Sequence, residues 1–244
     1  GFIFGGLGLL ALARSKLTLI KVIGLVLITL GSLTLAEYIF NVDFNIDQLF
    51  MTHYIDIQTS NPGRMAPNTA LCFSLVGFAL IAQLTNNLKK QLLWTSSLGF
   101  IVIALGVVAF GGYISNMETA YGWGNYTRMA VHTACSFIII GIGLVAFTLG
   151  KNLSQAKHLP FWLPISIGIG SFTITILMWQ SLHNMESQMV TLIGDKSINI
   201  VDESLLIFGL LLTGALVMAF RYYEIAVERL NISMKGEQEL SRIL

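Results

Sequence analysis

The stretch RMAPNTALCF occupies Arg64–Phe73, and a closely related stretch, RMAVHTACSF, occupies Arg128–Phe137. Each copy runs into an apolar segment that carries a glycine at the same place, Gly77 in the first and Gly141 in the second. Self-similarity of this kind indicates a duplicated structural unit. We therefore expect two equivalent polar corners, each marked by an arginine at the start of a helix.

The composition of the chain places it in a lipid bilayer. Hydrophobic residues make up 55% of the 244 residues, charged residues only 11%, and the mean hydropathy is +0.74. In a soluble domain about a quarter of the residues are charged. The net charge of +1 gives no reason to expect nucleic acid as a partner.

Long apolar segments separated by short polar ones predict an all-α integral membrane protein with seven transmembrane helices. A helix needs roughly 20 residues to span about 30 Å of hydrocarbon, and every segment but the first reaches that length. We expect the first segment to belong to a longer helix that begins before Gly1. The segments are Gly1–Ala13, Leu17–Phe40, Met65–Thr85, Leu92–Ser115, Met129–Gly150, Phe161–Leu182 and Ser204–Tyr222.

The charged residues distinguish the two faces of the predicted membrane domain. Three basic residues, Arg64, Arg128 and Lys196, lie on the face that also carries nine of the 13 acids. The other 11 of the 14 lysines and arginines lie in the segments 14–21, 89–90, 151–157 and 221–244. By the positive-inside rule the basic face is cytoplasmic, which places the C-terminus in the cytoplasm and the N-terminus outside.

The duplicated unit extends upstream of each arginine. Glu37-Tyr38 and Gly112-Tyr113 occupy matching places near the ends of the second and fourth predicted spans. Each unit is then a helix, an outer loop and a helix, over about 17–85 and 91–150, and the first loop is longer by an eleven-residue insertion. Two parallel copies can pack about a pseudo-twofold axis, and their interface is a natural pocket.

The candidate ligand-binding residues are polar groups at membrane depth. Glu37, Arg64 and Arg128 need partners or ligands there, because a bare charge near hydrocarbon is costly. Either Glu37 pairs with one arginine while the other extends to lipid headgroups, or the two arginines bind an anionic ligand. Thr69 and Thr133 lie five residues beyond each arginine, and their hydroxyls either bond back to their own helices or join the site.

Aromatic residues frame the same outer face, with Tyr38 at the first loop and Tyr113 and Trp123 at the second. An interfacial aromatic belt accounts for most of them. The functional alternative is a stacked aromatic ligand, or a cation held over the rings.

Two histidines, His132 and His183, fall at similar depth on the outer side and raise a metal hypothesis. Two imidazoles suit haem, and with nearby methionines they suit copper or zinc. Against this, the first unit has Asn68 where the second has His132. The sequence contains no nucleophile with a base at motif spacing and no phosphate-binding glycine loop, so it predicts no catalytic site.

The segment 223–244 is predicted to be a cytoplasmic signalling helix. Spacings of four and three alternate through the positions Tyr223, Val227, Leu230, Met234, Glu237, Ser241 and Leu244. This is the seam pattern of a dimeric coiled coil, which favours a homodimer. The alternative is an amphipathic tail on the inner leaflet.

The pair of stretches NPGRMAPNTALCF (Asn61–Phe73) and YTRMAVHTA (Tyr126–Ala134), followed by a seventh span and a charged helix, resembles the N-terminal membrane sensor regions of bacterial histidine kinases and diguanylate cyclases. The resemblance covers nearly the whole chain. It implies a dimeric, multi-span input module of the bacterial inner membrane that precedes an output domain. It implies no particular stimulus and no ligand residues.

We therefore expect residues 1–222 to form a transmembrane sensor domain and 223–244 to lead to an output domain beyond the sequence. A small ligand, lipid or cofactor at the outer repeat interface would favour one packing of the helices, and the coil would transmit that change. Two other functions are compatible with the sequence, namely a small membrane transporter or channel and a haem- or metal-binding membrane protein.

Overall fold

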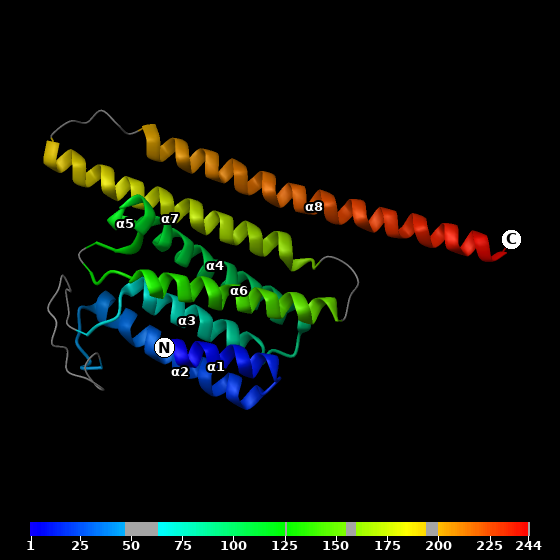
Figure 1. The fold of residues 1–244 in the computed structure, drawn as a ribbon, viewed down its shortest axis with the longest axis horizontal. Coiled ribbons are helices and arrows are strands. Elements are labelled where there is room, and N and C mark those ends of the chain that lie inside the picture. The colour runs from blue at the N-terminus through cyan, green and yellow to red at the C-terminus, as the bar shows by residue number, and fades with distance from the viewer. Residues whose placement is uncertain (47–62, 125, 155–159, 194–199, 244) are drawn as a thin grey trace.

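A computed structural model of the chain describes residues 1–46, 63–124, 126–154, 160–193 and 200–243. All regular secondary structure within these residues is helical, as predicted (Figure 1). The helices are α1 (Phe2–Ala13), α2 (Leu17–Phe40), α3 (Pro67–Ala82), α4 (Leu88–Ser115), α5 (Glu118–Tyr121), α6 (Val131–Leu153), α7 (Trp162–Ile193) and α8 (Ile200–Ile243). Lys157, Lys196 and most of the first outer loop, with its predicted insertion, lie outside the described residues.

Five helices of the described residues are long and apolar enough to cross a membrane, namely α2, α4, α6, α7 and α8. They indicate a membrane-embedded protein. The other two predicted spans form the shorter apolar helices α1 and α3. Helix α3 starts later than predicted because Pro67 occupies its first turn while Arg64–Ala66 remain non-helical. Its 16 residues measure about 24 Å, less than the hydrocarbon thickness.

The long helices run side by side, so the connections gather at two ends of the molecule (Figure 1). Helices α2, α4 and α7 end, and α3, α6 and α8 begin, at one end, which we call the Arg64 end. The opposite end, which we call the Arg14 end, carries the turn between α1 and α2 and the start of α4. Of the described basic residues before α8, all but Arg64 and Arg128 lie toward the Arg14 end.

Glycines bring the backbones of α2 and α3, and of α4 and α6, into direct contact. A Cβ atom on Gly77 would lie 2.7 Å from the carbonyl oxygen of Gly24. In the second pair, a Cβ atom on Gly141 would lie 2.8 Å from the carbonyl oxygen of Gly99. Small residues permit such close crossings in lipid, where helix association depends on packing. The two helix pairs therefore cross at matching places.

A second matching contact lies seven residues, or about two helical turns, further along α2 and α4. A Cβ atom on Gly31 would lie 2.4 Å from the carbonyl oxygen of Ala70, and one on Gly106 would lie 2.9 Å from that of Ala134. Helices α2 and α4 also end alike, at Asn41 and Asn116 in the left-handed conformation. In both cases the next N–H group bonds a carbonyl five residues back, at 3.2 and 2.8 Å, which closes the helix.

The two helix pairs meet through aromatic rings. Phe73 of α3 and Phe137 of α6, which occupy the same position in the two sequence stretches, pack edge to face with ring centroids 4.9 Å apart. Phe2 of α1 packs against both, with each centroid distance 5.0 Å. Equivalent residues that contact each other lie next to any axis that relates the two pairs.

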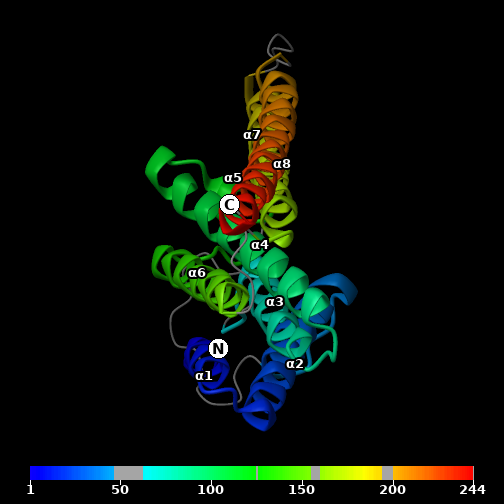
Figure 2. The same ribbon diagram turned by 90° about the vertical axis from the view of Figure 1, so that its right-hand side faces the viewer.

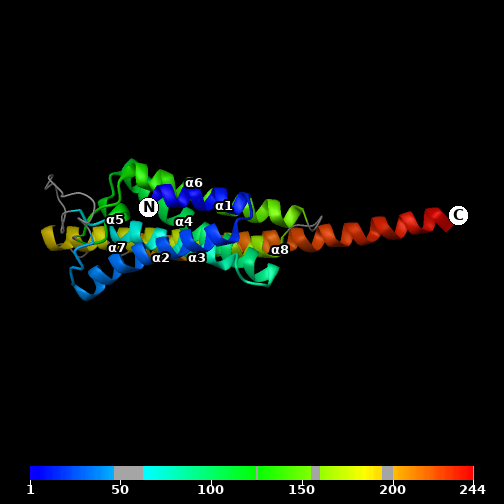
Figure 3. The same ribbon diagram turned by 90° about the horizontal axis from the view of Figure 1, so that it is seen from below.

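Helices α7 and α8 form an antiparallel hairpin that projects from the other helices (Figure 2). The hydroxyl oxygens of Ser171 and Thr213 lie 2.8 Å apart, and a Cβ atom on Gly209 would lie 2.5 Å from Thr175. Helix α8 then continues beyond the ends of the other helices (Figure 3). It covers the predicted coiled-coil segment to Ile243, but the side chains of its seam from position 230 onward lie outside the described residues.

The glycine contacts lead to a test of the helix pairing. The Gly31→Ala substitution should destabilise the protein by about 1–3 kcal/mol, because its methyl group would clash with backbone atoms of α3. Those atoms can move away only if the two helices separate. Gly111→Ala is a matched control on α4, since a Cβ atom there meets nothing within 4 Å. It should leave stability unchanged or slightly higher, since alanine favours helix. Thermal unfolding in detergent measures both, and equal effects would contradict the proposed packing.

Candidate functional site

The corner at Arg64 is a buried ion pair. The Arg64 side chain is 4% exposed and its Nε lies 3.4 Å from Oε2 of Glu37, which is fully buried. A second acid, Asp43, lies 3.4 Å from Nη2, and the guanidinium sits 5.5 Å from the centre of the Tyr38 ring. The arginine is therefore enclosed by two carboxylates and an aromatic face.

Glu37 also orders the chain that leaves α2. Its Oε1 accepts a hydrogen bond of 2.9 Å from the backbone N–H of Phe44. One carboxylate thus contacts both the arginine that precedes α3 and the loop that follows α2. Of the two predicted alternatives, the pairing of Glu37 with one arginine is confirmed, and the geometry at this corner is that of a structural clamp. The other arginine, Arg128, was expected to extend to lipid headgroups but pairs with Glu118.

The corner at Arg128 is open. Its Nη1 and Nη2 donate to the two carboxylate oxygens of Glu118 at 3.0 and 2.7 Å, which makes a bidentate ion pair. The side chains are 38% and 61% exposed. Charge at this corner is accessible, so a ligand can compete for it.

The difference between the corners follows from one position in the repeat. Gly112 stands where the first unit has Glu37, and α5 packs on it so closely that a Cβ there would lie 2.6 Å from Cβ of Ala120. A glutamate at 112 would occupy the place of α5. In the second unit, the carboxylate that pairs with the arginine comes instead from Glu118 at the start of α5.

Tyr38 and Tyr113 fasten each helix end to the backbone just after the corresponding arginine. Their hydroxyls donate to the carbonyl oxygens of Met65 and Met129, at 3.0 and 2.6 Å. Tyr38 also lies 3.4 Å from the hydroxyl of Thr127, so it links the two corners. The rings of the two tyrosines pack on protein: Tyr113 stacks on Tyr121 with centroids 4.0 Å apart, and Tyr38 packs on Tyr126 at 4.7 Å.

Thr69 and Thr133 are buried in the first turns of α3 and α6, close to the two corners. Their neighbour Asn68, which was not among the predicted site residues, contacts the backbone of another helix. Its Nδ2 donates to the carbonyl oxygen of Tyr121 at 3.1 Å, and its Oδ1 accepts from the N–H of Thr69. Asn68 thus attaches α3 to α5. Its only signal in the sequence was the exchange of asparagine for histidine between the two units.

A polar cleft of about 310 Å³ opens beside Arg128, between the α5 region and α7. The residues that line it are Glu118, Thr119, Gly122, Gly124, Arg128, Asn184, Ser187 and Gln188. A smaller cavity of about 90 Å³ adjoins it, shares Thr119, Gly124 and Asn184, and is also lined by Trp123 and Asn68. Of the predicted ligand residues, Arg128 therefore lines this cleft and Trp123 the smaller cavity beside it, while Glu37 and Arg64 form the separate clamp.

The wall of the cleft is held in place by two hydrogen bonds between α5 and α7. The Thr119 hydroxyl donates to the carbonyl oxygen of Ser181 at 2.7 Å, and the Ser181 hydroxyl donates to the carbonyl oxygen of Thr119 at 3.3 Å. The α7 wall was not predicted from the sequence, because the sixth span was expected to end at Leu182. The helix continues to Ile193, and Asn184, Ser187 and Gln188 in this extension line the cleft.

The two histidines of the metal hypothesis have different surroundings. His183 Nδ1 lies 2.9 Å from Oδ2 of Asp202 on α8, and its ring stacks on Trp179 at 5.6 Å. His132 is exposed at the start of α6, and α4 packs between α6 and α7 (Figure 2). Within the described ranges, no group of three or more histidines, cysteines or acids is placed to hold a metal ion.

No protein-family model, curated protein or solved structure matches this chain. The resemblance to kinase and cyclase sensor regions therefore remains a prediction from the sequence. The structural features that bear on function are the cleft, the clamp and the hairpin of α7 and α8.

The two corners predict opposite responses to the same mutation. Arg64→Ala should cost about 3–5 kcal/mol of stability, because it leaves Glu37 charged and buried. Arg128→Ala should cost less than about 1 kcal/mol, because its pair with Glu118 is solvated. Thermal unfolding of the purified variants in detergent compares them.

A double substitution separates lost charge pairing from lost packing. Glu37→Leu combined with Arg64→Met removes both charges and should recover much of the stability that Arg64→Ala loses. If the double variant is less stable than Arg64→Ala, the clamp does not act through its charge pair.

Proposed function

We propose that this chain is the membrane-embedded sensory input module of a bacterial signal-transduction protein. A small ligand binds in the polar cleft at the Arg64 end, and α8 transmits the response to a cytoplasmic output domain. The observation that carries the proposal is that α7 forms one wall of the cleft and also packs along α8. A ligand that shifts α7 thereby acts on the helix that leaves the domain.

The proposed architecture is seven spans, α1 to α4 and α6 to α8, and two tandem parallel repeats formed by α2 with α3 and by α4 with α6. The matching glycine crossings at Gly77 and Gly141 support the repeats. The contact between Phe73 and Phe137 supports a pseudo-twofold axis between them. The cleft proposed as the ligand site lies between the α5 region and α7, and not at the interface of the two repeats where the sequence predicted the pocket.

The lining of the cleft supports one chemical class of ligand. Arg128 offers a guanidinium, Asn184 and Gln188 offer amides, and Thr119 and Ser187 offer hydroxyls. These groups suit a small polar molecule with a carboxylate or phosphate, which would compete with Glu118 for Arg128. Glu118 pairs with the Arg128 guanidinium in this structure, and a bound anion would displace it.

Transmission follows from the packing of α7. The pair of Thr119 and Ser181 joins α7 to the cleft, and the contacts of Ser171 with Thr213 and of Thr175 with Gly209 join α7 to α8. A small sliding of α7 against α5 is of the kind seen at packed helix interfaces in switching proteins. In this proposal the segment 223–244 pairs with a second copy and carries the shift from the membrane to the cytoplasmic output domain.

The proposed orientation places the Arg64 end outside the cytoplasm and the C-terminus inside. Basic residues concentrated at the Arg14 end, such as Arg14, Lys16, Lys89 and Lys90, support it through the positive-inside rule. The output domain would then meet α8 on the cytoplasmic side of the bacterial inner membrane.

Small molecules that co-purify with the chain test the proposed site. Mass spectrometry of denatured wild-type protein should reveal an anionic polar molecule that is at least tenfold depleted in Arg128→Ala, because the guanidinium supplies its charge-assisted contact. Arg221→Ala is the matched control, since it removes an exposed arginine of α8 far along the chain from the cleft. Equal amounts in all three proteins would refute the cleft as the binding site.

The same purified protein distinguishes sensing from transport. A sensor should produce no flux of the identified molecule across proteoliposome membranes, whereas a transporter moves it. Reproducible, saturable flux that Arg128→Ala abolishes would favour the transporter over the sensor.

A further inference from the structure

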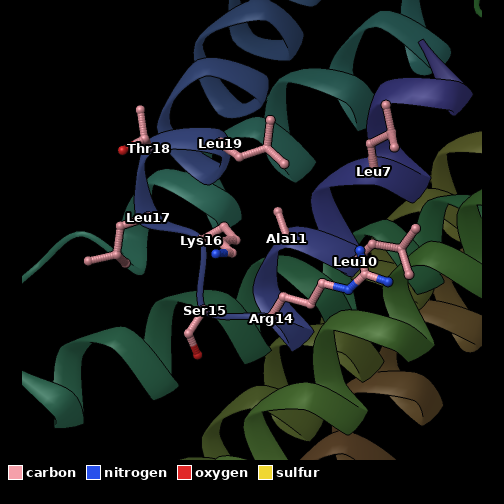
Figure 4. Close-up of a pocket in the computed structure, with 9 residues that line it drawn as sticks. All are labelled: Leu7, Leu10, Ala11, Arg14, Ser15, Lys16, Leu17, Thr18 and Leu19. Carbon is pink, nitrogen blue, oxygen red and sulfur yellow. The ribbon is translucent and has the colours of Figure 1, made fainter.

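A groove of about 590 Å³ lies at the Arg14 end, far along the helices from the polar cleft. It is formed by the last turns of α1, the turn at 14–16 and the first turn of α2 (Figure 4). The residues that line it are Leu7, Leu10, Ala11, Arg14, Ser15, Lys16, Leu17, Thr18 and Leu19. The proposed sensing mechanism uses none of them.

One part of the groove is apolar and open. The side chains of Leu7 and Leu10 on α1 are 42% and 54% exposed, and Leu19 on α2 is 45% exposed. In Figure 4, Leu7 and Leu19 flank the groove from its two helices. In a bilayer, exposed leucines at this depth contact hydrocarbon, so this part of the groove fits an acyl chain.

The other part of the groove is cationic. Arg14 and Lys16 lie at its end, both exposed, and the Arg14 side chain extends toward Leu10 (Figure 4). The lining contains no carboxylate. In the described part of the chain, neither cation forms an ion pair, in contrast to Arg64 and Arg128. This end of the groove therefore carries two positive charges that no carboxylate of the described residues neutralises.

The turn that presents these charges is closed by backbone hydrogen bonds. Ser15 adopts the left-handed conformation at φ 52°, and its N–H bonds the carbonyl oxygen of Leu12 at 3.1 Å. The N–H of Lys16 bonds the carbonyl oxygen of Ala11 at 3.0 Å. This is the usual way to close a helix end, and it fixes the backbone positions of Arg14 and Lys16 on either side of Ser15.

We propose that this groove binds an anionic phospholipid. Its phosphate lies between Arg14 and Lys16, and one acyl chain lies along Leu7, Leu10 and Leu19. The combination of an apolar channel within the bilayer and cations at its rim matches the two halves of a phospholipid. A net negative headgroup is required, because the ammonium of a zwitterionic lipid would be repelled by the same cations. The bound lipid bridges α1 and α2 and stabilises their packing.

Lipid-dependent stability of the full chain tests the site. Phosphatidylglycerol added to protein in neutral detergent should raise the thermal unfolding midpoint, and phosphatidylcholine should not. In the double variant Arg14→Gln with Lys16→Gln, the apparent affinity for phosphatidylglycerol should fall on the order of 30-fold, from the loss of two basic contacts. Native mass spectrometry, which counts bound lipids directly, provides a second measurement that does not depend on stability.

The matched control is Lys89→Gln with Lys90→Gln, which removes two exposed cations from the start of α4 at the same end of the molecule. This variant should retain wild-type affinity. The proposal is overturned if the control loses as much affinity as the Arg14 and Lys16 variant, or if phosphatidylcholine binds equally well. An equal effect of inorganic phosphate alone would show a small-anion site and would also overturn it. None of these outcomes bears on the cleft at Arg128.

Discussion

Direct backbone contact at glycines is the constraint on which the arrangement of this protein depends. Gly24 meets Gly77 and Gly99 meets Gly141 so closely that no side chain fits between the helices. Each contact fixes one helix pair, and each pair then places its arginine and tyrosine at the Arg64 end. Since apolar side chains gain little from leaving lipid, helix association in a bilayer relies on this kind of packing.

The two helix pairs share a frame but differ in chemistry. In the first pair, Glu37 fills the corner and neutralises Arg64 inside the protein. In the second pair, Gly112 leaves that space to α5, and Arg128 meets Glu118 where both are solvated. A buried pair of this kind is costly to break and suits a fixed structural role. A solvated pair is cheap to exchange for a ligand, which makes the second corner the better candidate for binding.

The hairpin of α7 and α8 gives the cleft a mechanical connection to the end of the chain. The polar residues Asn184, Ser187 and Gln188 stand on the same helix that carries Ser171 and Thr175 to α8. At the other end of the molecule, the turn at Arg14 and Lys16 faces the opposite membrane surface. The two ends of the molecule thus differ, since one carries a polar cleft and the other a groove lined by exposed leucines and two cations.

The sequence by itself determined the helical class, most helix boundaries to within a few residues and the similarity of the stretches that begin at Arg64 and Arg128, because hydrophobic length and sequence similarity are local properties. It also pointed to the pairing of Glu37 with an arginine, since a charge at that depth requires a partner. Only the tertiary structure decided which arginine is enclosed, that Glu118 serves the other, and that His183 meets Asp202. Those pairings join residues of different helices, and their distances depend on how α5 and α7 pack, which no local pattern records.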